Sequence, residues 1–276
     1  MLDKVIVSQK MFLSLLLSVP LLTFAFLSQT AVAEDLAKKS GWEGGVSVVT
    51  VGFSQKSQFT AEDDNTFTND LYNAGKSTHQ FTTLPLFHLN YTLSDLQTQI
   101  FFGNNQDNVP KAQFALQAGV LHVIGAHDQV SVALIPTLPF VEETWQDPFL
   151  TGQQRHKTKE EVGGGRIKYE HTGDNAFDVQ YVFAKNELDV EESGKALLQL
   201  NTQQRAMLNR NAELHRFSVS LNCPVDQGII IVPSFHVTTS DAKGDANDFA
   251  EGVFKLQSIY ATKKHLFSAT LGVGKR

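Results

Sequence analysis

Apolar and polar residues alternate with a period of two along most of the chain. Between positions 177 and 183, for example, Phe, Val, Tyr and Phe alternate with Asp, Gln and Val. This period is typical of a β-strand with one buried face. Similar alternation, weaker at the first and third of these segments, occurs at 44–54, 81–93, 97–103, 112–120, 130–140, 166–170, 217–221, 229–237, 254–260 and 267–273. The pattern predicts an all-β chain with about eleven visible strands.

The connections between the predicted strands are long and short in turn. The long ones are 55–79, 104–111, 142–162, 187–212 and 240–248, and the short ones are 94–96, 125–128, 172–175, 224–227 and 261–264. Antiparallel strands joined in this way place every long loop at one end, as in transmembrane barrels with tight periplasmic turns. A Greek-key sandwich has no reason to do so. We therefore predict an antiparallel up-and-down transmembrane β-barrel, with a secreted sandwich or soluble barrel as the alternative.

The first 33 residues have the pattern of a secretory signal peptide. Lys4 and Lys10 precede an apolar run over 11–27, and Ala-Val-Ala at 31–33 supplies a cleavage site. A transmembrane anchor is the alternative, but the run is short for a spanning helix. We expect residues 34–276 to be exported and to form a single outer-membrane-type β-barrel domain, located in the cell outer membrane.

Composition excludes several classes of function. The 276 residues include 23 Lys and Arg against 29 Asp and Glu, which gives a formal net charge of −6. A negative chain is a poor partner for nucleic acid, because phosphate contacts need a basic face. The single cysteine excludes a disulfide framework and a zinc site made of cysteines.

An odd number of strands conflicts with a complete barrel. Bacterial single-chain barrels close with an even number of strands, and Gly274-Lys275-Arg276 offers no terminal aromatic residue. We therefore expect a chain truncated at its C-terminus, with twelve or more strands in the complete protein. A miscount by one strand is the alternative.

Three parts of the sequence resemble one protein family. The stretches are Glu-Thr-Trp-Gln-Asp-Pro-Phe at 143–149 followed by Gly152 and Arg155, Ser-Gly-Lys-Ala-Leu at 193–197 leading to Leu-Asn-Arg-Asn at 208–211, and Gly-Asp-Ala-Asn at 244–247. Together they resemble the domain-of-unknown-function family 2860 of gram-negative bacteria, over residues 41–260. The resemblance implies a secreted protein that looks like an outer-membrane barrel and extends beyond residue 276. It implies no activity and no site residues.

Familiar catalytic motifs do not occur in the sequence. It has no G-x-S-x-G elbow, no H-E-x-x-H zinc motif and no glycine-rich phosphate loop. We therefore predict no enzymatic activity, no catalytic or metal-binding residues and no cofactor. An outer-membrane hydrolase built from isolated Ser, His and Asp residues on neighbouring strands is a third alternative for the function.

Two polar clusters could bind ions, although ordinary loops explain both. Four side chains with oxygen atoms share one predicted turn: Asp241, Asp245, Asn247 and Asp248. They could ligate Ca²⁺, but Lys243 stands where an EF-hand loop needs a ligand, which favours a plain polar turn. Four basic or imidazole side chains share another connection: Arg155, His156, Lys157 and Lys159. They could contact lipopolysaccharide phosphates, and a solvated loop of mixed charge is the favoured interpretation. Partly periodic apolar residues also predict an amphipathic helix over 193–212, which either narrows the barrel mouth or caps the strand ends.

Charged residues at the polar positions of the strands are the best functional candidates. Five of them are expected to face the barrel lumen: Arg166, Lys168, Glu170, Asp178 and Arg216. Opposite charges facing each other across a lumen create a transverse field and tune selectivity. We therefore predict a passive pore for small hydrophilic solutes, with a closed barrel that acts as a surface binding or structural protein as the alternative. The expected partners are outer-membrane lipid, lipopolysaccharide, the barrel-insertion machinery and small solutes, and the oligomeric state is left open.

Overall fold

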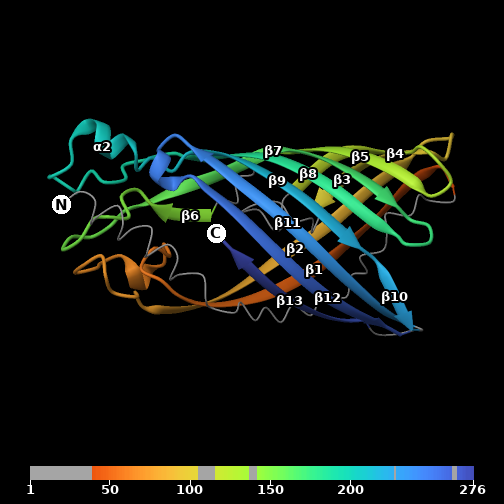
Figure 1. The fold of residues 1–276 in the computed structure, drawn as a ribbon, viewed down its shortest axis with the longest axis horizontal. Coiled ribbons are helices and arrows are strands. Elements are labelled where there is room, and N and C mark those ends of the chain that lie inside the picture. The colour runs from red at the N-terminus through yellow and green to blue at the C-terminus, as the bar shows by residue number, and fades with distance from the viewer. Residues whose placement is uncertain (1–38, 105–115, 137–141, 227, 263–265) are drawn as a thin grey trace.

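One large antiparallel sheet makes up most of the structure. The computed structural model describes residues 39–104, 116–136, 142–226, 228–262 and 266–276 (Figure 1). Within these ranges thirteen strands belong to a single sheet, and helix is confined to α2 (Thr202–Ala206) and the 3-10 turns η1 (Asp63–Asn65) and η2 (Asp245–Asn247). The prediction of an all-β, antiparallel chain is confirmed. None of these helices is long and apolar enough to cross a membrane.

Eleven strands lie side by side in the order of the chain. They are β1 (Gly41–Lys56), β2 (Ser77–Thr92), β3 (Thr98–Asn104), β4 (Leu116–Val123), β5 (Asp128–Ile135), β7 (Lys157–His171), β8 (Phe177–Leu188), β9 (Ala212–Leu221), β11 (Ile229–Ala242), β12 (Phe249–Ala261) and β13 (Leu266–Lys275). Each corresponds to one of the eleven predicted strands. Two short strands that were not predicted, β6 (Glu142–Trp145) and β10 (Cys223–Asp226), pair with β7 and β11 beside this path. The predicted signal peptide at 1–33, and parts of the predicted strands at 112–120 and 130–140, lie outside the described residues.

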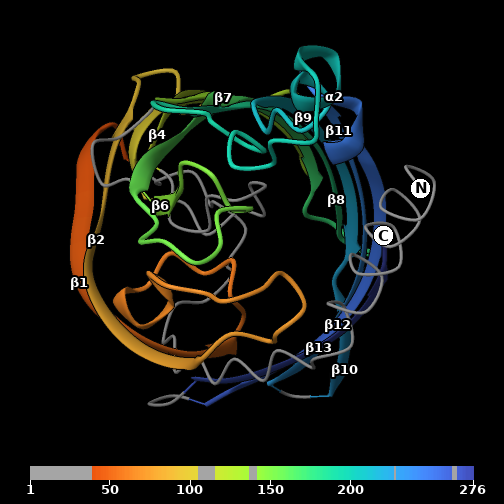
Figure 2. The same cartoon turned by 90° about the vertical axis from the view of Figure 1, so that its left-hand side faces the viewer.

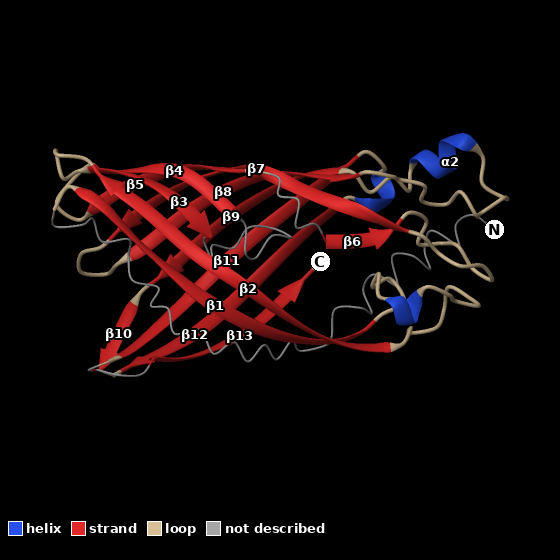
Figure 3. Cartoon of the chain, turned by 180° about the vertical axis from the view of Figure 1, so that it is seen from behind, coloured by secondary structure: helices blue, strands red, loops and turns tan. Residues whose placement is uncertain are grey.

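Long and short connections lie at opposite ends of the sheet. Figures 1 and 3 show α2, β6 and the 3-10 turns at one end, which we call the loop end, and short turns at the other, the turn end. The β2–β3 turn illustrates how the short turns are held. Backbone N–H groups of Gln97 and Thr98 and the Thr98 hydroxyl donate to the Asp95 carboxylate. These hydrogen bonds hold the pKa of Asp95 below its ordinary value.

The two faces of the sheet differ in polarity. The exposed face is apolar on most strands, with exposed side chains that include Ile100, Phe102, Val120, Val132, Leu134, Ile167, Tyr181, Phe217, Phe235, Phe254 and Leu256. The buried face is rich in polar side chains, which include Gln99, Gln117, Gln129, Ser131, Arg166, Glu170, Gln180, Asn186, Ser218, His236, Thr238 and Ser240. Buried polar groups and exposed apolar patches are both uncommon in soluble proteins.

The sheet curls about its long axis, so that one face is concave (Figure 2). Because side chains on the inside of such a curl are shielded, we identify the buried face with the concave face. A small apolar cluster of Phe101, Leu121 and Ala133 lies on it. Within the described residues no pairing joins β1 to β13, and the sheet is not closed.

The predicted helix over 193–212 is wrong for most of its length. Only residues 202–206 are α-helical, and Asn201 caps them through a reciprocal pair of hydrogen bonds with Gln204. Gly194 has a φ of +79°, in the left-handed region. A residue in that conformation cannot be part of a right-handed helix, so no helix begins at 193, and turns lie between this glycine and α2.

Candidate functional site

Connections at the loop end are bound together into a structure that we call the cap, formed by residues 57–76, 142–156, 189–211 and 243–248. Trp145 is its centre and is 0% exposed. The indole Nε1 donates to the carbonyl of Gln58 at 3.2 Å. The Arg155 guanidinium lies 4.5 Å from the centroid of the indole ring and donates to the carbonyl of Asn65. Burial lowers the pKa of Arg155, and the cation–π contact helps to hold this buried charge.

Asp147 joins two connections of the cap through backbone groups. Its Oδ1 accepts hydrogen bonds from the N–H of Phe149 at 3.0 Å and of Gly194 at 2.9 Å. Its Oδ2 accepts from the N–H of Ala196 at 2.7 Å. A buried carboxylate with three N–H donors is well satisfied. Asp147 therefore fixes residues 193–196 against β6.

Arg210 makes a second junction in the cap. Its Nε lies 2.9 Å from a carboxylate oxygen of Glu191. Its Nη2 donates to the carbonyls of Trp145 at 2.6 Å and Gln146 at 3.1 Å, and its Nη1 donates to the Thr144 hydroxyl at 3.3 Å. The planar guanidinium thus ties the segment before β9 to β6.

The turn between β11 and β12 completes the cap. The Asn247 side-chain amide donates to the carbonyls of Leu208 at 2.9 Å and Asn209 at 3.1 Å. Asp248 accepts from the N–H of Ala242 at 2.7 Å. Asn247 and Asp248, two of the four side chains considered as Ca²⁺ ligands, thus close the turn, which agrees with the favoured interpretation of a plain polar turn. Among the described residues no group of three or more His, Cys, Asp or Glu is placed to hold a metal ion.

Two members of the predicted basic cluster, one in the cap and one at the start of β7, contact other parts of the protein. Arg155 is buried against Trp145, as described above. Lys157 forms ion pairs with Asp63 at 2.9 Å and Glu143 at 3.2 Å. Arg155 is buried and Lys157 is paired with acidic side chains, so we do not interpret the cluster as a surface patch for phosphates.

Arg166 lies on the concave wall of the sheet and is 3% exposed. Its Nε donates to the Gln117 side chain at 2.6 Å, and its Nη1 donates to the Ser131 hydroxyl at 3.4 Å. Its guanidinium is 5.7 Å from the Phe101 ring, three strands away. The side chain therefore lies along the wall, where it binds neighbouring strands.

The other four predicted lumen residues share the buried face with Arg166. Lys168 pairs with Glu170 on the same strand at 3.3 Å, and Glu170 also accepts from the Gln129 amide at 3.1 Å. Asp178 is the register partner of Glu170 on β8. Arg216 lies apart on β9, where its Nε donates to the Thr238 hydroxyl at 2.8 Å. Lys168, Glu170 and Asp178 are thus neighbours on β7 and β8. This differs from the predicted arrangement, in which the basic and acidic groups face each other across a lumen.

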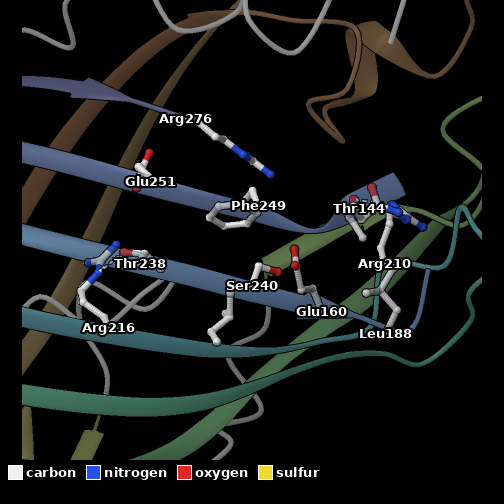
Figure 4. A pocket seen from close by; sticks show the side chains of 12 residues that line it. Thr144, Glu160, Leu188, Arg210, Arg216, Thr238, Ser240, Phe249, Glu251 and Arg276 are labelled. Atoms are coloured by element: carbon white, nitrogen blue, oxygen red, sulfur yellow. Dashed lines mark hydrogen bonds between the residues drawn. The ribbon is translucent and has the colours of Figure 1, made fainter. Parts of the chain in front are cut away.

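A cavity of about 360 Å³ lies between the concave wall and the cap. Figure 4 shows its charged and hydroxyl side chains, which come from β6, β7, β9, β11, β12, the segment before β9 and the residue after β13. Its charged side chains are those of Glu160, Arg210, Arg216, Glu251 and Arg276. Of these, only Arg216 was predicted from the sequence. Glu160 was assigned to a loop, because β7 extends further towards the loop end than its apolar residues indicate.

A serine–histidine group on the same wall was not predicted. The two ring nitrogens of His236 lie 2.8 Å from the Ser218 hydroxyl and 3.1 Å from the Ser234 hydroxyl. Such a pair is the minimum that a serine hydrolase needs. Ser218 and His236 are both buried, and neither lines the cavity. We therefore interpret the group as a hydrogen-bonded link between β9 and β11.

Comparison with known proteins identifies the family. A family model described as "Protein of unknown function (DUF2860)" matches residues 41–276, and the chain belongs to this family. The three stretches through which the sequence resembles the family meet in the cap. No curated protein matches the sequence.

Proposed function

We propose that this member of the DUF2860 family is an outer-membrane β-barrel through which small hydrophilic solutes diffuse. The proposal rests on one observation, the exposed apolar face and buried polar face of the sheet. In water an apolar surface of this extent favours association or aggregation. In a bilayer the same surface faces lipid, while the polar side chains line the interior.

Strand length and the limits of the apolar surface support a membrane location. β7, β8, β11 and β12 have 15, 12, 14 and 13 residues, and about 9–11 residues cross a bilayer when tilted. Towards the loop end, the exposed apolar residues of β8 and β9 give way to an ion pair between Lys185 and Glu213 at 3.2 Å. Near the turn end, aromatic rings such as Tyr260 and Phe267 stack on the exposed face, as expected at a membrane interface.

In this proposal the closed barrel has twelve or more strands. All pairings along the path of eleven strands are antiparallel, so β1 and β13 run in the same direction. One additional antiparallel strand between them would satisfy the backbone groups of both edges, which lipid cannot do.

The cap supports a second candidate, a closed barrel that binds a ligand or has a structural role. Figure 2 looks onto the loop end and shows β6 and the segment around η1 within the outline of the curled sheet. These segments are held by the buried Trp145 and Arg155. A cap held so firmly would obstruct a wide channel. In a pore, only small solutes would then pass beside the cap.

The two candidates are separated by folding the full chain into liposomes and measuring conductance in planar bilayers. A band whose gel mobility changes on boiling shows an inserted, folded barrel. Steady conductance steps are then expected for a pore, and an inserted but silent protein would instead support the closed barrel. A protein that stays soluble and monomeric without a mobility change contradicts both candidates.

A further inference from the structure

We propose that residues 57–76, which we call the lid, move away from the rest of the cap as one unit and so open the mouth of the barrel. The lid connects β1 to β2 and contains η1, which Figure 2 shows within the outline of the curled sheet. The inference deepens the proposed function by giving the barrel a movable closure. It rests on that function only for the effect of the lid on conductance.

The lid is held together by its own hydrogen bonds. Asn65 joins its two ends, because the side-chain amide donates to the carbonyl of Ser57 at 3.1 Å and the side-chain oxygen accepts from the N–H of Lys76 at 3.0 Å. The Gln58 amide donates to the carbonyl of Asn73 at 3.0 Å. The lid therefore has polar contacts of its own across its width, as compact Ω-loops have, and can keep its shape when it moves.

The two ends of the lid meet at one point. Lys56, the last residue of β1, is the register partner of Ser77, the first residue of β2. Next to this point, Gly75 has a φ of +75°, a conformation that glycine adopts without strain. Hinges are commonly a few residues at the ends of elements that absorb changes in φ and ψ. Rotation about this narrow attachment would carry the whole lid while β1 and β2 stay paired.

The lid is seated on the segment that leads into β7. Two backbone hydrogen bonds of 2.8 Å join the lid to this segment, and Phe67 faces Gln154 there in an isolated antiparallel bridge. Lys157 adds an ion pair with Asp63, whose side chain is 94% exposed. Hydrogen bonds and ion pairs that water can replace contribute little net free energy. The lid can therefore leave this seat and return to it.

The buried contact of the seat carries an unbalanced charge. Arg155 is buried, and among the described residues its Nε and Nη1 have no hydrogen-bond partner. Its guanidinium lies over the Trp145 ring and donates to the carbonyl of Asn65 in the lid, and neither of these partners carries a negative charge. Burial of a charge without an ionic partner is costly. Since the lid contributes to this burial through Asn65, Arg155 opposes the seated position.

The connection 189–211 is attached to the cap by charged groups that have their partners. Asp147 accepts hydrogen bonds from three backbone N–H groups, two of them in 189–211. Arg210 pairs with Glu191 and donates to the carbonyl of Trp145 on β6. Charge-assisted hydrogen bonds of this kind are strong. This difference in attachment identifies the lid as the part of the cap that moves.

The test locks the lid with a disulfide and measures how far Trp145 is reached from water. Directly opposed residues of antiparallel strands have Cα atoms about 4.5–5.5 Å apart, a separation that a disulfide can span. Phe67→Cys with Gln154→Cys therefore ties the lid to its seat. Cys223→Ser removes the one natural cysteine, and Trp42→Phe leaves Trp145 as the only tryptophan.

Acrylamide, a quencher dissolved in the water, is added to this full chain folded in liposomes. Trp145 is buried and donates to Gln58 of the lid, so its quenching reports movement of the lid. We expect quenching in the reduced chain, loss of most of it in the disulfide-linked chain, and recovery with dithiothreitol. Equal quenching of the reduced and linked chains would overturn the proposal.

The matched control carries a disulfide between two strands that stay paired. Lys185 and Glu213 are register partners on β8 and β9, outside the lid, and Lys185→Cys with Glu213→Cys replaces the lid pair in the same background. Oxidation of this control should leave the quenching of Trp145 unchanged. A fall as large as that in the lid pair would show that oxidation alone protects Trp145, and would contradict the proposal.

Amide hydrogen exchange tests the movement in the unaltered chain, whether or not a cysteine variant folds. The N–H of Arg155 donates to a carbonyl of the lid, the N–H of Asn65 donates to Glu62 within the lid, and the N–H of Ala196 donates to Asp147. We expect the N–H of Arg155 to exchange faster than the other two. Exchange at Arg155 as slow as at Ala196 would show a fixed lid. Exchange at Asn65 as fast as at Arg155 would show a lid that unfolds instead of moving as one unit.

Conductance distinguishes failure of this inference from failure of the pore. The disulfide-linked chain should lose the largest conductance steps of the reduced chain. Equal steps in the two forms would retain the proposed pore and reject the lid as its closure. Suppressed quenching in a linked chain that is inserted but silent in both forms would retain the lid and identify the closed barrel.

Discussion

Asp147 connects segments that are almost fifty residues apart in the sequence. It accepts hydrogen bonds from the N–H groups of Phe149, Gly194 and Ala196, and it is buried. One carboxylate oxygen accepts from the N–H of Ala196, and the other accepts from the N–H groups of Phe149 and Gly194. Because both oxygens are needed as acceptors, even a substitution of the same shape should disrupt the junction.

Asp147→Asn should therefore loosen residues 193–197 of the cap by about 1–3 kcal/mol, because the new amide NH₂ faces a backbone N–H and leaves it unsatisfied. Amide hydrogen exchange of this segment in the folded protein measures the effect, and faster exchange is expected there but not in β8 or β9. Asp174→Asn, in an exposed turn at the other end, is the matched control. Unchanged exchange at Gly194 and Ala196 would show that Asp147 does not hold the cap.

For individual residues, the sequence predicted the face of the strand better than the hydrogen-bond partners of each side chain. Arg166 and Glu170 were placed on the polar side of their strand, and both are buried there. Their contacts with Gln117 and Gln129 join residues 49 and 41 positions apart, and local alternation does not contain that information. Trp145 was likewise noticed only as part of a motif, because its hydrogen-bond partner Gln58 is 87 positions away.

Whether a strand could be predicted from the sequence depended on its length. The eleven longer strands show the period of two over enough residues to be recognised. β6 and β10 have four residues each, too few for a period to be visible. The helix over 193–212 was predicted from apolar spacing, but the N–H groups of Gly194 and Ala196 bind Asp147 instead of carbonyls within a helix. Long-range hydrogen bonds decided the conformation of this segment.

The exposed face of β5 offers a direct test of the proposed membrane location. Val132 lies on this face and is 54% exposed. Val132→Lys should destabilise a lipid-embedded barrel by about 2–4 kcal/mol, because it places a charge near the middle of the apolar surface. Unfolding by urea in liposomes, followed by the loss of the heat-dependent gel shift, measures the change.

Thr239→Lys is the matched control for this substitution. Thr239 is exposed near the loop end of β11, beyond the apolar residues of that strand. A lysine there should have little effect, since its charge would reach water. Equal stability of the two variants would contradict a lipid-facing surface on β5 and favour a soluble β-protein.

The whole molecule has features that no single strand reveals. Alternation in the sequence distinguishes two faces but does not say which face is inside, since an apolar core and a lipid-facing surface produce the same pattern. Burial identifies the inner face as the polar one, because Gln117 and Arg166 are buried while Val132 and Phe217 are exposed. Closure depends on how β1 and β13 are paired, which depends on the entire curl of the sheet.

The two tryptophans report on different parts of the molecule and allow its position in a bilayer to be measured. Trp42 is the second residue of β1 and is 71% exposed, and its ring centroid lies 4.9 Å from that of Tyr91. Trp145 is 0% exposed in the cap. Since the turn end and the loop end lie at opposite ends of the strands, only Trp42 should reach lipid. Trp145→Phe leaves Trp42 as the single fluorophore, and Trp42→Phe leaves Trp145.

In liposomes whose acyl chains carry bromine near the headgroups, we expect strong quenching of the chain that retains Trp42 and little quenching of the chain that retains Trp145. The same chains held unfolded in urea beside the liposomes are the control, and should show no difference between the two tryptophans. Quenching of Trp145 would place the cap inside the bilayer, which its buried polar groups make costly. Absence of quenching at Trp42 would mean that the exposed apolar face meets water or another protein, and the proposed barrel would have to be abandoned.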